Sequence, residues 1–97
     1  MVREYEVALV FRVDTNENVT NQAIEQVQSW VEADEISKIT KINRWGRRKL
    51  AYEIDKQREG YYVFMDAEIE TTHIPEIERN LKLSNDVLRY LIVRPEA

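Results

Sequence analysis

Residues 61–69 read YYVFMDAEI, a run of strand-forming residues that alternates between two chemically different faces. One face is apolar apart from a single hydroxyl, and it comprises Tyr61, Val63, Met65, Ala67 and Ile69. The other face combines two aromatic rings with two acids: Tyr62, Phe64, Asp66 and Glu68. Because successive side chains of a strand point to opposite sides of the sheet, we assign the first face to the core and the second to an open side.

The segments at the two ends of the chain show the same alternation. Residues 5–13 place their strand formers on one face: Tyr5, Val7, Leu9, Phe11 and Val13. In residues 87–94, before Pro95, a face of Leu88, Tyr90 and Ile92 alternates with Arg89, Leu91 and Val93. We therefore expect Ala8, Val10, Leu91 and Val93 to join Tyr62 and Phe64 on the open side. Such a surface is more apolar than a free monomer normally exposes, so it predicts a partner.

Two segments carry helical spacing. After the turn-forming and cap-forming residues 14–18, apolar side chains recur every three or four positions, at Val19, Ala23, Ile24, Val27, Trp30 and Val31. Residues 71–75 supply a threonine as a cap and a proline for the first turn of a second helix. The stripe that this helix is expected to bury is Ile74, Ile77 and Leu81, and the helix is expected to end at residues 84–86.

The segment between the first helix and residue 61 has a less regular pattern. Ile36, Ile39, Ile42 and Trp45 recur every third residue, a spacing that suits neither an ideal strand nor an ideal helix. The content of isoleucine and threonine favours a long, bent strand with a bulge near Gly46, continuing to residue 54. Residues 55–60 then form a predicted hairpin loop that ends in its glycine.

The resulting order is β-α-β-β-α-β. This is the ferredoxin-like plan of the α+β class, with a four-stranded antiparallel sheet and two helices on one face. The 97 residues contain 43% hydrophobic residues, enough for one core and too few residues for two. We expect a single domain spanning residues 1–97.

Composition argues against several functional classes. The chain has no Cys, which excludes disulfides, thiolate metal sites and cysteine nucleophiles. There is no apolar run of about 20 residues and no secretion signal, so we expect a cytoplasmic protein with no membrane contact. The only histidine, His73, is expected to be a surface residue of the second helix. We expect no catalytic residue, metal, cofactor or small-molecule substrate.

Basic residues gather in one stretch, RWGRRKLAY, residues 44–52. Residues 14–37 contain six acids and no Lys or Arg, whereas residues 38–58 contain eight bases against Glu53 and Asp55. The side chains of Arg47 and Arg48 are planar forks that suit phosphate oxygens. A solvated charged loop is the common alternative for such a run. Because we expect the run to be unmatched by acids and it is flanked by aromatic residues, we predict shape-directed binding of RNA phosphates.

Tyr62 and Phe64 also allow a base-stacking interpretation, since sheets of this plan can stack nucleobases. Asp66 and Glu68 share their face and would repel phosphates. We therefore favour contact with a protein, and a merely exposed aromatic pair is the alternative.

Four blocks occur in the same order as in a known family: REYEV at 3–7, WGRRKLAY at 45–52, GYYVF at 60–64 and NDVLR at 85–89. Together they resemble the bacterial ribosomal small-subunit protein S6 family, and the second block is the specific one. The chain departs from that family at Glu53, where proline is common. The resemblance implies a ferredoxin-like domain without catalytic activity, in the cytoplasmic ribosome. It also implies binding to small-subunit (16S) ribosomal RNA together with ribosomal protein S18.

Carried over by position, the resemblance implies two sets of site residues. The RNA-facing set is Arg3, Arg44, Arg47, Arg48, Lys49, Arg89 and Arg94. The partner-facing set is Tyr62, Phe64 and Leu91. An alternative function is a homodimeric α+β barrel that encloses a ligand or acts as a regulatory domain. The open face offers neither a second histidine nor a convergent polar set for such a site.

Overall fold

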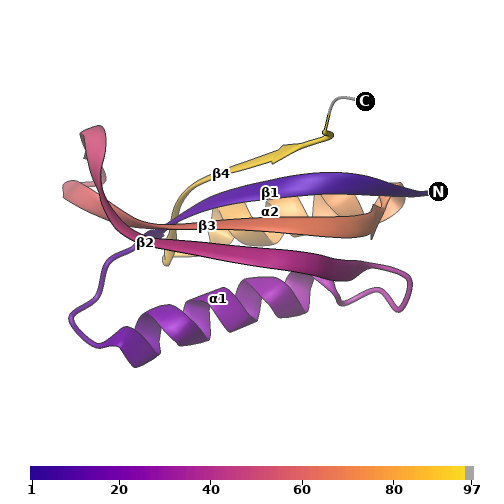
Figure 1. Cartoon of the computed structure of the whole chain (residues 1–97), viewed down its shortest axis with the longest axis horizontal. Coiled ribbons are helices and arrows are strands. Elements are labelled where there is room, and N and C mark those ends of the chain that lie inside the picture. The colour runs from indigo at the N-terminus through magenta and orange to yellow at the C-terminus, as the bar shows by residue number, and fades with distance from the viewer. Residues whose placement is uncertain (96–97) are drawn as a thin grey trace.

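The computed structural model describes residues 1–95 and confirms the predicted order of elements. The elements are β1 (Val2–Arg12), α1 (Glu17–Val31), β2 (Lys38–Ile54), β3 (Gln57–Glu70), α2 (Ile74–Leu83) and β4 (Val87–Val93). One turn of 3-10 helix, η1 (Thr71–His73), precedes α2. The strands form an antiparallel sheet in the order β2-β3-β1-β4, so β2 and β4 are its two edges (Figure 1). This is the ferredoxin-like fold.

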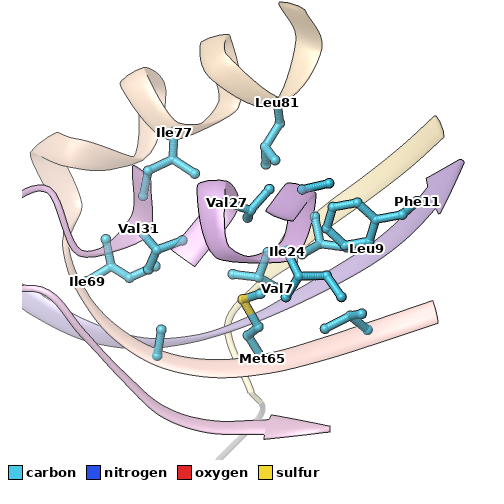
Figure 2. Close-up of a cluster of buried hydrophobic side chains, with 13 residues drawn as sticks. Val7, Leu9, Phe11, Ile24, Val27, Val31, Met65, Ile69, Ile77 and Leu81 are labelled. Atoms are coloured by element: carbon cyan, nitrogen blue, oxygen red, sulfur yellow. The ribbon is translucent and has the colours of Figure 1, made fainter. Parts of the chain in front are cut away.

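The core lies between the sheet and both helices, as Figure 2 shows. Its buried side chains from β1 and β3 are Val7, Leu9, Phe11, Val63, Met65, Ala67 and Ile69. The helices contribute Ala23, Ile24, Val27, Val31, Ile77 and Leu81. The face of β3 that the sequence assigned to the core is therefore buried, except that Tyr61 is only half-buried at its end. The alternate face of the sheet carries no helix.

The first helix begins as the sequence predicts, whereas the second begins differently. Asn16 caps α1 by accepting a hydrogen bond from the backbone N–H of Asn18. The predicted threonine cap of α2 is wrong, because η1 leads directly into α2 and no side chain caps it. Val19, which the spacing placed on the buried stripe of α1, is 39% exposed.

His73 is not the surface residue that we expected. Its side chain is 10% exposed, and ring Nε2 lies 2.9 Å from the backbone carbonyl oxygen of Trp30 near the end of α1. Glu76 lies 3.7 Å from the other ring nitrogen. His73 therefore joins the end of α1 to the start of α2.

The bulges predicted in β2 are present. The register with β3 shifts between Ile39 and Lys41 and again between Arg44 and Gly46. Gly46 has φ +84°, a left-handed conformation that side-chain-bearing residues rarely adopt. Trp45, inside the second shift, packs on Phe64 of the uncovered face.

The predicted hairpin loop over residues 55–60 is wrong. The turn consists of Asp55 and Lys56 alone, both with positive φ (48° and 64°), and β3 begins at Gln57. Two positive φ values are typical of a type I′ turn, which matches the twist of the flanking strands. Gly60 is a buried strand residue instead, and a Cβ atom there would lie 2.3 Å from Cγ1 of Val10. This glycine is needed for close packing rather than for a turn.

Candidate binding surfaces

The uncovered face of the sheet contains an apolar groove. Phe64 and Tyr62 of β3 pair with Ala8 and Val10 of β1, and Leu91 of β4 pairs with Ala8 on the other side. The groove has a volume of about 230 Å³ and is lined by Ala8, Leu9, Val10, Tyr62, Phe64, Arg89, Tyr90 and Leu91. Leu91 is 59% exposed, although it is a large aliphatic side chain. The three residues of the predicted partner-facing set thus lie together in one groove.

Two arginine–aromatic pairs lie beside this groove. The guanidinium carbon of Arg48 lies 5.9 Å from the centre of the Trp45 ring, and Trp45 packs at 4.6 Å on Phe64. The guanidinium of Arg89 lies 5.7 Å from the centre of the Tyr52 ring. Trp45 and Tyr52 are 56% and 61% exposed, so both rings are accessible. A guanidinium over a ring keeps its charge while its position becomes better defined.

The far half of the β2–β3 hairpin forms a wall at one end of the groove. Figure 1 shows this hairpin bending away from α1 at its tip. Arg12 at the end of β1 forms an ion pair with Asp55 in the turn. Leu50 is buried, and Gly60 packs against Val10. These contacts hold the tip against the sheet end from which Arg12 projects.

The ion pair with Arg12 also affects Asp55. The hydrogen bond from Arg12, followed by its positive charge, holds the pKa of the Asp55 carboxyl below its ordinary value. Arg12 is not among the site residues predicted from the sequence. Its place in the alternation of β1, on the same face as Val10, is the signal that could have found it.

The basic stretch of β2 is divided between the two sides of the sheet. Arg48 pairs with Gly60 and lies on the open side over Trp45. Arg44 lies on the helix side, where it donates hydrogen bonds to the Tyr61 hydroxyl at 3.1 Å and to Asn21 of α1. Neighbouring bases in the sequence therefore do not form a single patch.

The expectation that the basic stretch has no acidic partners is wrong. Antiparallel pairing brings Glu59 of β3 beside it, and Glu59 forms a 2.6 Å ion pair with Arg47. Within residues 1–95, Arg48 and Lys49 are in no ion pair. Within the same residues Arg44 is in no ion pair either, but it is hydrogen-bonded to Tyr61 and Asn21, so Arg48 and Lys49 are the cations of the stretch most available to a ligand.

The remaining predicted RNA-facing residues lie elsewhere. Arg89 lines the groove from β4. Arg3 and Arg94 line a shallow hollow that also contains Glu4 and Glu68, beyond the opposite end of the groove. The seven predicted residues thus occupy the hairpin, the groove, the helix side of β2, the start of β1 and the position just after β4.

The part of the chain that the structure describes contains no group of three or more metal-ligating side chains. None of its helices is long and apolar enough to cross a membrane. The chain is a ferredoxin-like domain with one uncovered sheet face, an apolar groove and exposed arginine–aromatic pairs. These features are typical of α+β proteins that bind macromolecules.

A family model described as Ribosomal protein S6 matches residues 4–94 of the chain. The chain belongs to the ribosomal protein S6 family. It is 38% identical over 96 residues to the small ribosomal subunit protein bS6 of Carboxydothermus hydrogenoformans, covering 99% of each chain. It is 39% identical over 95 residues to the bS6 protein of Moorella thermoacetica, covering 98% of this chain and 96% of that protein.

A solved structure agrees with this assignment. The crystal structure of 30S ribosomal protein S6 from Thermotoga maritima is similar with a TM-score of 0.89 and 27% sequence identity. The similarity covers 98% of this chain and 89% of that chain.

Proposed function

We propose that the chain is a structural constituent of the small subunit of the cytoplasmic ribosome, where it binds small-subunit ribosomal RNA together with ribosomal protein S18. Membership of the S6 family supports this role. No catalytic step is part of the proposal. The observation that carries it is the separation of two surfaces on one sheet. Free cations lie on the hairpin, and an apolar groove lies beside them.

The hairpin is the proposed centre of RNA contact. Arg48 is held over Trp45 on the open side, whereas Lys49 pairs with Glu59 and points to the other side, so the two are proposed to contact RNA from the two sides of the hairpin. Phosphate contacts of this kind position a protein on RNA by charge and shape without reading its sequence. Arg47, Arg89, Arg3 and Arg94 are proposed as further contacts. Arg44 belongs to the proposed set, but its bonds to Tyr61 and Asn21 predict a smaller contribution.

The groove is the proposed site of S18. Tyr62, Phe64 and Leu91 present aromatic and aliphatic surface that water solvates poorly. Burial of such surface by a partner supplies non-directional affinity, and the charged residues around it set orientation.

The salt dependence of RNA binding tests the assignment of the hairpin. Each lost phosphate contact lowers the slope of log K against log salt by about 0.7 to 0.9. Arg48→Ala with Lys49→Ala should therefore lower the slope by about 1.5, with S18 present throughout. The matched control is Arg79→Ala with Lys82→Ala, which removes two exposed charges from α2. Equal slopes for the two double variants would show that the hairpin is not the RNA site.

The homodimer is a second candidate because an uncovered apolar groove is also typical of a surface that a second copy of a chain covers. Sedimentation of the isolated protein separates the two proposals. A monomer at micromolar concentration supports the ribosomal role, and a stable dimer that ignores RNA supports the homodimer.

A further inference from the structure

The uncovered face of the sheet changes in charge along its strands. At one end, Glu4 pairs directly with Glu68, and Glu6 pairs directly with Asp66, across β1 and β3. The next two pairs are apolar and belong to the groove. At the other end lie Arg12, Arg48 and Arg89. The face therefore runs from acidic through apolar to basic.

The acidic end has unfavourable interactions within the free chain. Like charges directly opposite one another on a sheet are destabilising. Within residues 1–95, Glu4, Glu6 and Asp66 are in no ion pair. Along the β2 side, Lys38 lies 3.8 Å from Glu68 and Lys41 pairs in register with Asp66.

On the β4 side there is less compensation. The register partner of Glu6 on this strand is Val93, an apolar and exposed residue. Arg94 follows it, in the hollow that also contains Glu4. The position above Glu6 and Asp66 is therefore the place where a cation from outside would relieve the repulsion and gain two carboxylate contacts.

The basic end limits the shape of what can bind. The hairpin tip is held there by the ion pair between Arg12 and Asp55 and by the contact between Tyr52 and Arg89. A flat second sheet would meet this wall before it lay against the groove. A narrow segment of chain lying beside the wall would not. This argues against a second copy of the chain as the occupant.

We propose that the groove takes a narrow segment of a partner protein with apolar side chains over Tyr62 and Phe64 and a Lys or Arg side chain over Glu6 and Asp66. The basic end of this segment points toward the start of β1, and its apolar part lies against the hairpin. The inference rests on the proposed function, in which the partner is S18, and it adds the direction and charge of the docked segment. RNA is a poor occupant because its phosphates would meet four carboxylates.

The test measures the affinity of the purified chain for purified S18 by titration calorimetry at low and high salt. Glu6→Gln with Asp66→Asn should weaken binding about 3- to 10-fold at low salt, as expected for the loss of exposed charge pairs. The difference should shrink at high salt because screening weakens the pairs. The matched control is Glu17→Gln with Glu25→Gln, the same charge change at two exposed positions of α1, which should keep affinity within about twofold.

A second measurement shows that the variant still folds. Because Glu6→Gln with Asp66→Asn removes an opposed pair of like charges, its melting temperature should equal or exceed that of the unmodified chain. Equal affinities of the acid-pair and control variants would overturn the inference and leave the proposed function standing. If the unmodified chain did not bind S18, the proposed function would be overturned, and with it the assignment of a segment of S18 to the groove. RNA binding that depends on Tyr62 without S18 would also overturn the inference.

Discussion

The hydroxyl of Tyr52 on β2 accepts a 2.8 Å hydrogen bond from the guanidinium of Arg89 on β4, although these two strands form opposite edges of the sheet. The contact is possible because the β2–β3 hairpin bends over the uncovered face. It links the strand that carries the free cations to a residue that lines the groove.

Substitution at Tyr52 tests how much this link contributes. Tyr52→Phe removes the hydrogen bond and keeps the ring, and it should lower the free energy of unfolding by about 0.5 kcal/mol, since the pair is exposed. Tyr52→Ala also removes the cation–π contact and should cost about 0.5 to 1 kcal/mol more. Urea denaturation measures both. Identical stabilities of the two variants and the unmodified chain would show that the hairpin is held by other contacts.

Gly60 provides a test of close packing. Gly60→Ala would place a Cβ atom 2.3 Å from Cγ1 of Val10, so we expect a loss of about 1 to 3 kcal/mol. Adding Val10→Ala should recover part of this loss because it removes the atom in conflict. At Gly46, where no atom lies within 4 Å, substitution by Ala should cost about 1 kcal/mol through its φ of +84° alone, and Val10→Ala should not reduce that cost. Denaturation of the four variants decides between steric and conformational causes. If Val10→Ala failed to help Gly60→Ala, the steric account would be wrong.

The pair of Arg12 and Asp55 predicts a pH dependence of stability. Because Arg12 lowers the pKa of Asp55 in the folded chain, the unfolded chain binds the proton more readily. The contribution of this pair to the free energy of unfolding is therefore fully present above the pKa of Asp55 in the unfolded chain, near pH 4. It is lost as the pH falls through the lower pKa of Asp55 in the folded chain. The Asp55→Asn variant should be less stable than the unmodified chain at pH 7, and the difference should narrow toward pH 2. Thermal melting at both pH values measures it, and a difference that stays constant would contradict the assignment.

Leu91 tests the groove without disturbing the core. It is 59% exposed in the free chain, so Leu91→Ala should change the free energy of unfolding by less than about 0.5 kcal/mol. If S18 covers Leu91, the affinity of the Leu91→Ala variant for S18 should be about fivefold lower than that of the unmodified chain, because less apolar surface is buried. Leu83→Ala is the matched control, since Leu83 is 72% exposed on α2. Equal S18 affinities of the two variants would place the partner elsewhere.

Alternation in residues 61–69 was enough to predict which face of β3 is buried, and with it the groove. That inference succeeded because side-chain direction in a strand follows from its period of two. The hairpin turn could not be predicted in the same way. Asp55 and Lys56 lack the glycine typical of such turns, while the nearby Gly60 offered a stronger but misleading signal.

The grouping of bases was misleading for a related reason. Residues that are adjacent in a strand point to opposite sides, so Arg47 and Arg48 separate even though they are neighbours. The antiparallel partner strand then supplies Glu59, which no count along the local sequence would pair with Arg47. The charge of a sheet surface therefore cannot be read from the sequence of one strand. It also depends on which residues of the neighbouring strand lie opposite.

The central claim is that RNA and S18 bind adjacent surfaces of one domain and support each other. The most direct measurement is the affinity of the chain for small-subunit ribosomal RNA, with and without saturating S18. Because two linked contacts raise overall affinity by making the second contact intramolecular, S18 should increase RNA affinity by at least about 10- to 100-fold. RNA binding by the chain alone that is equally tight and indifferent to S18 would contradict the account.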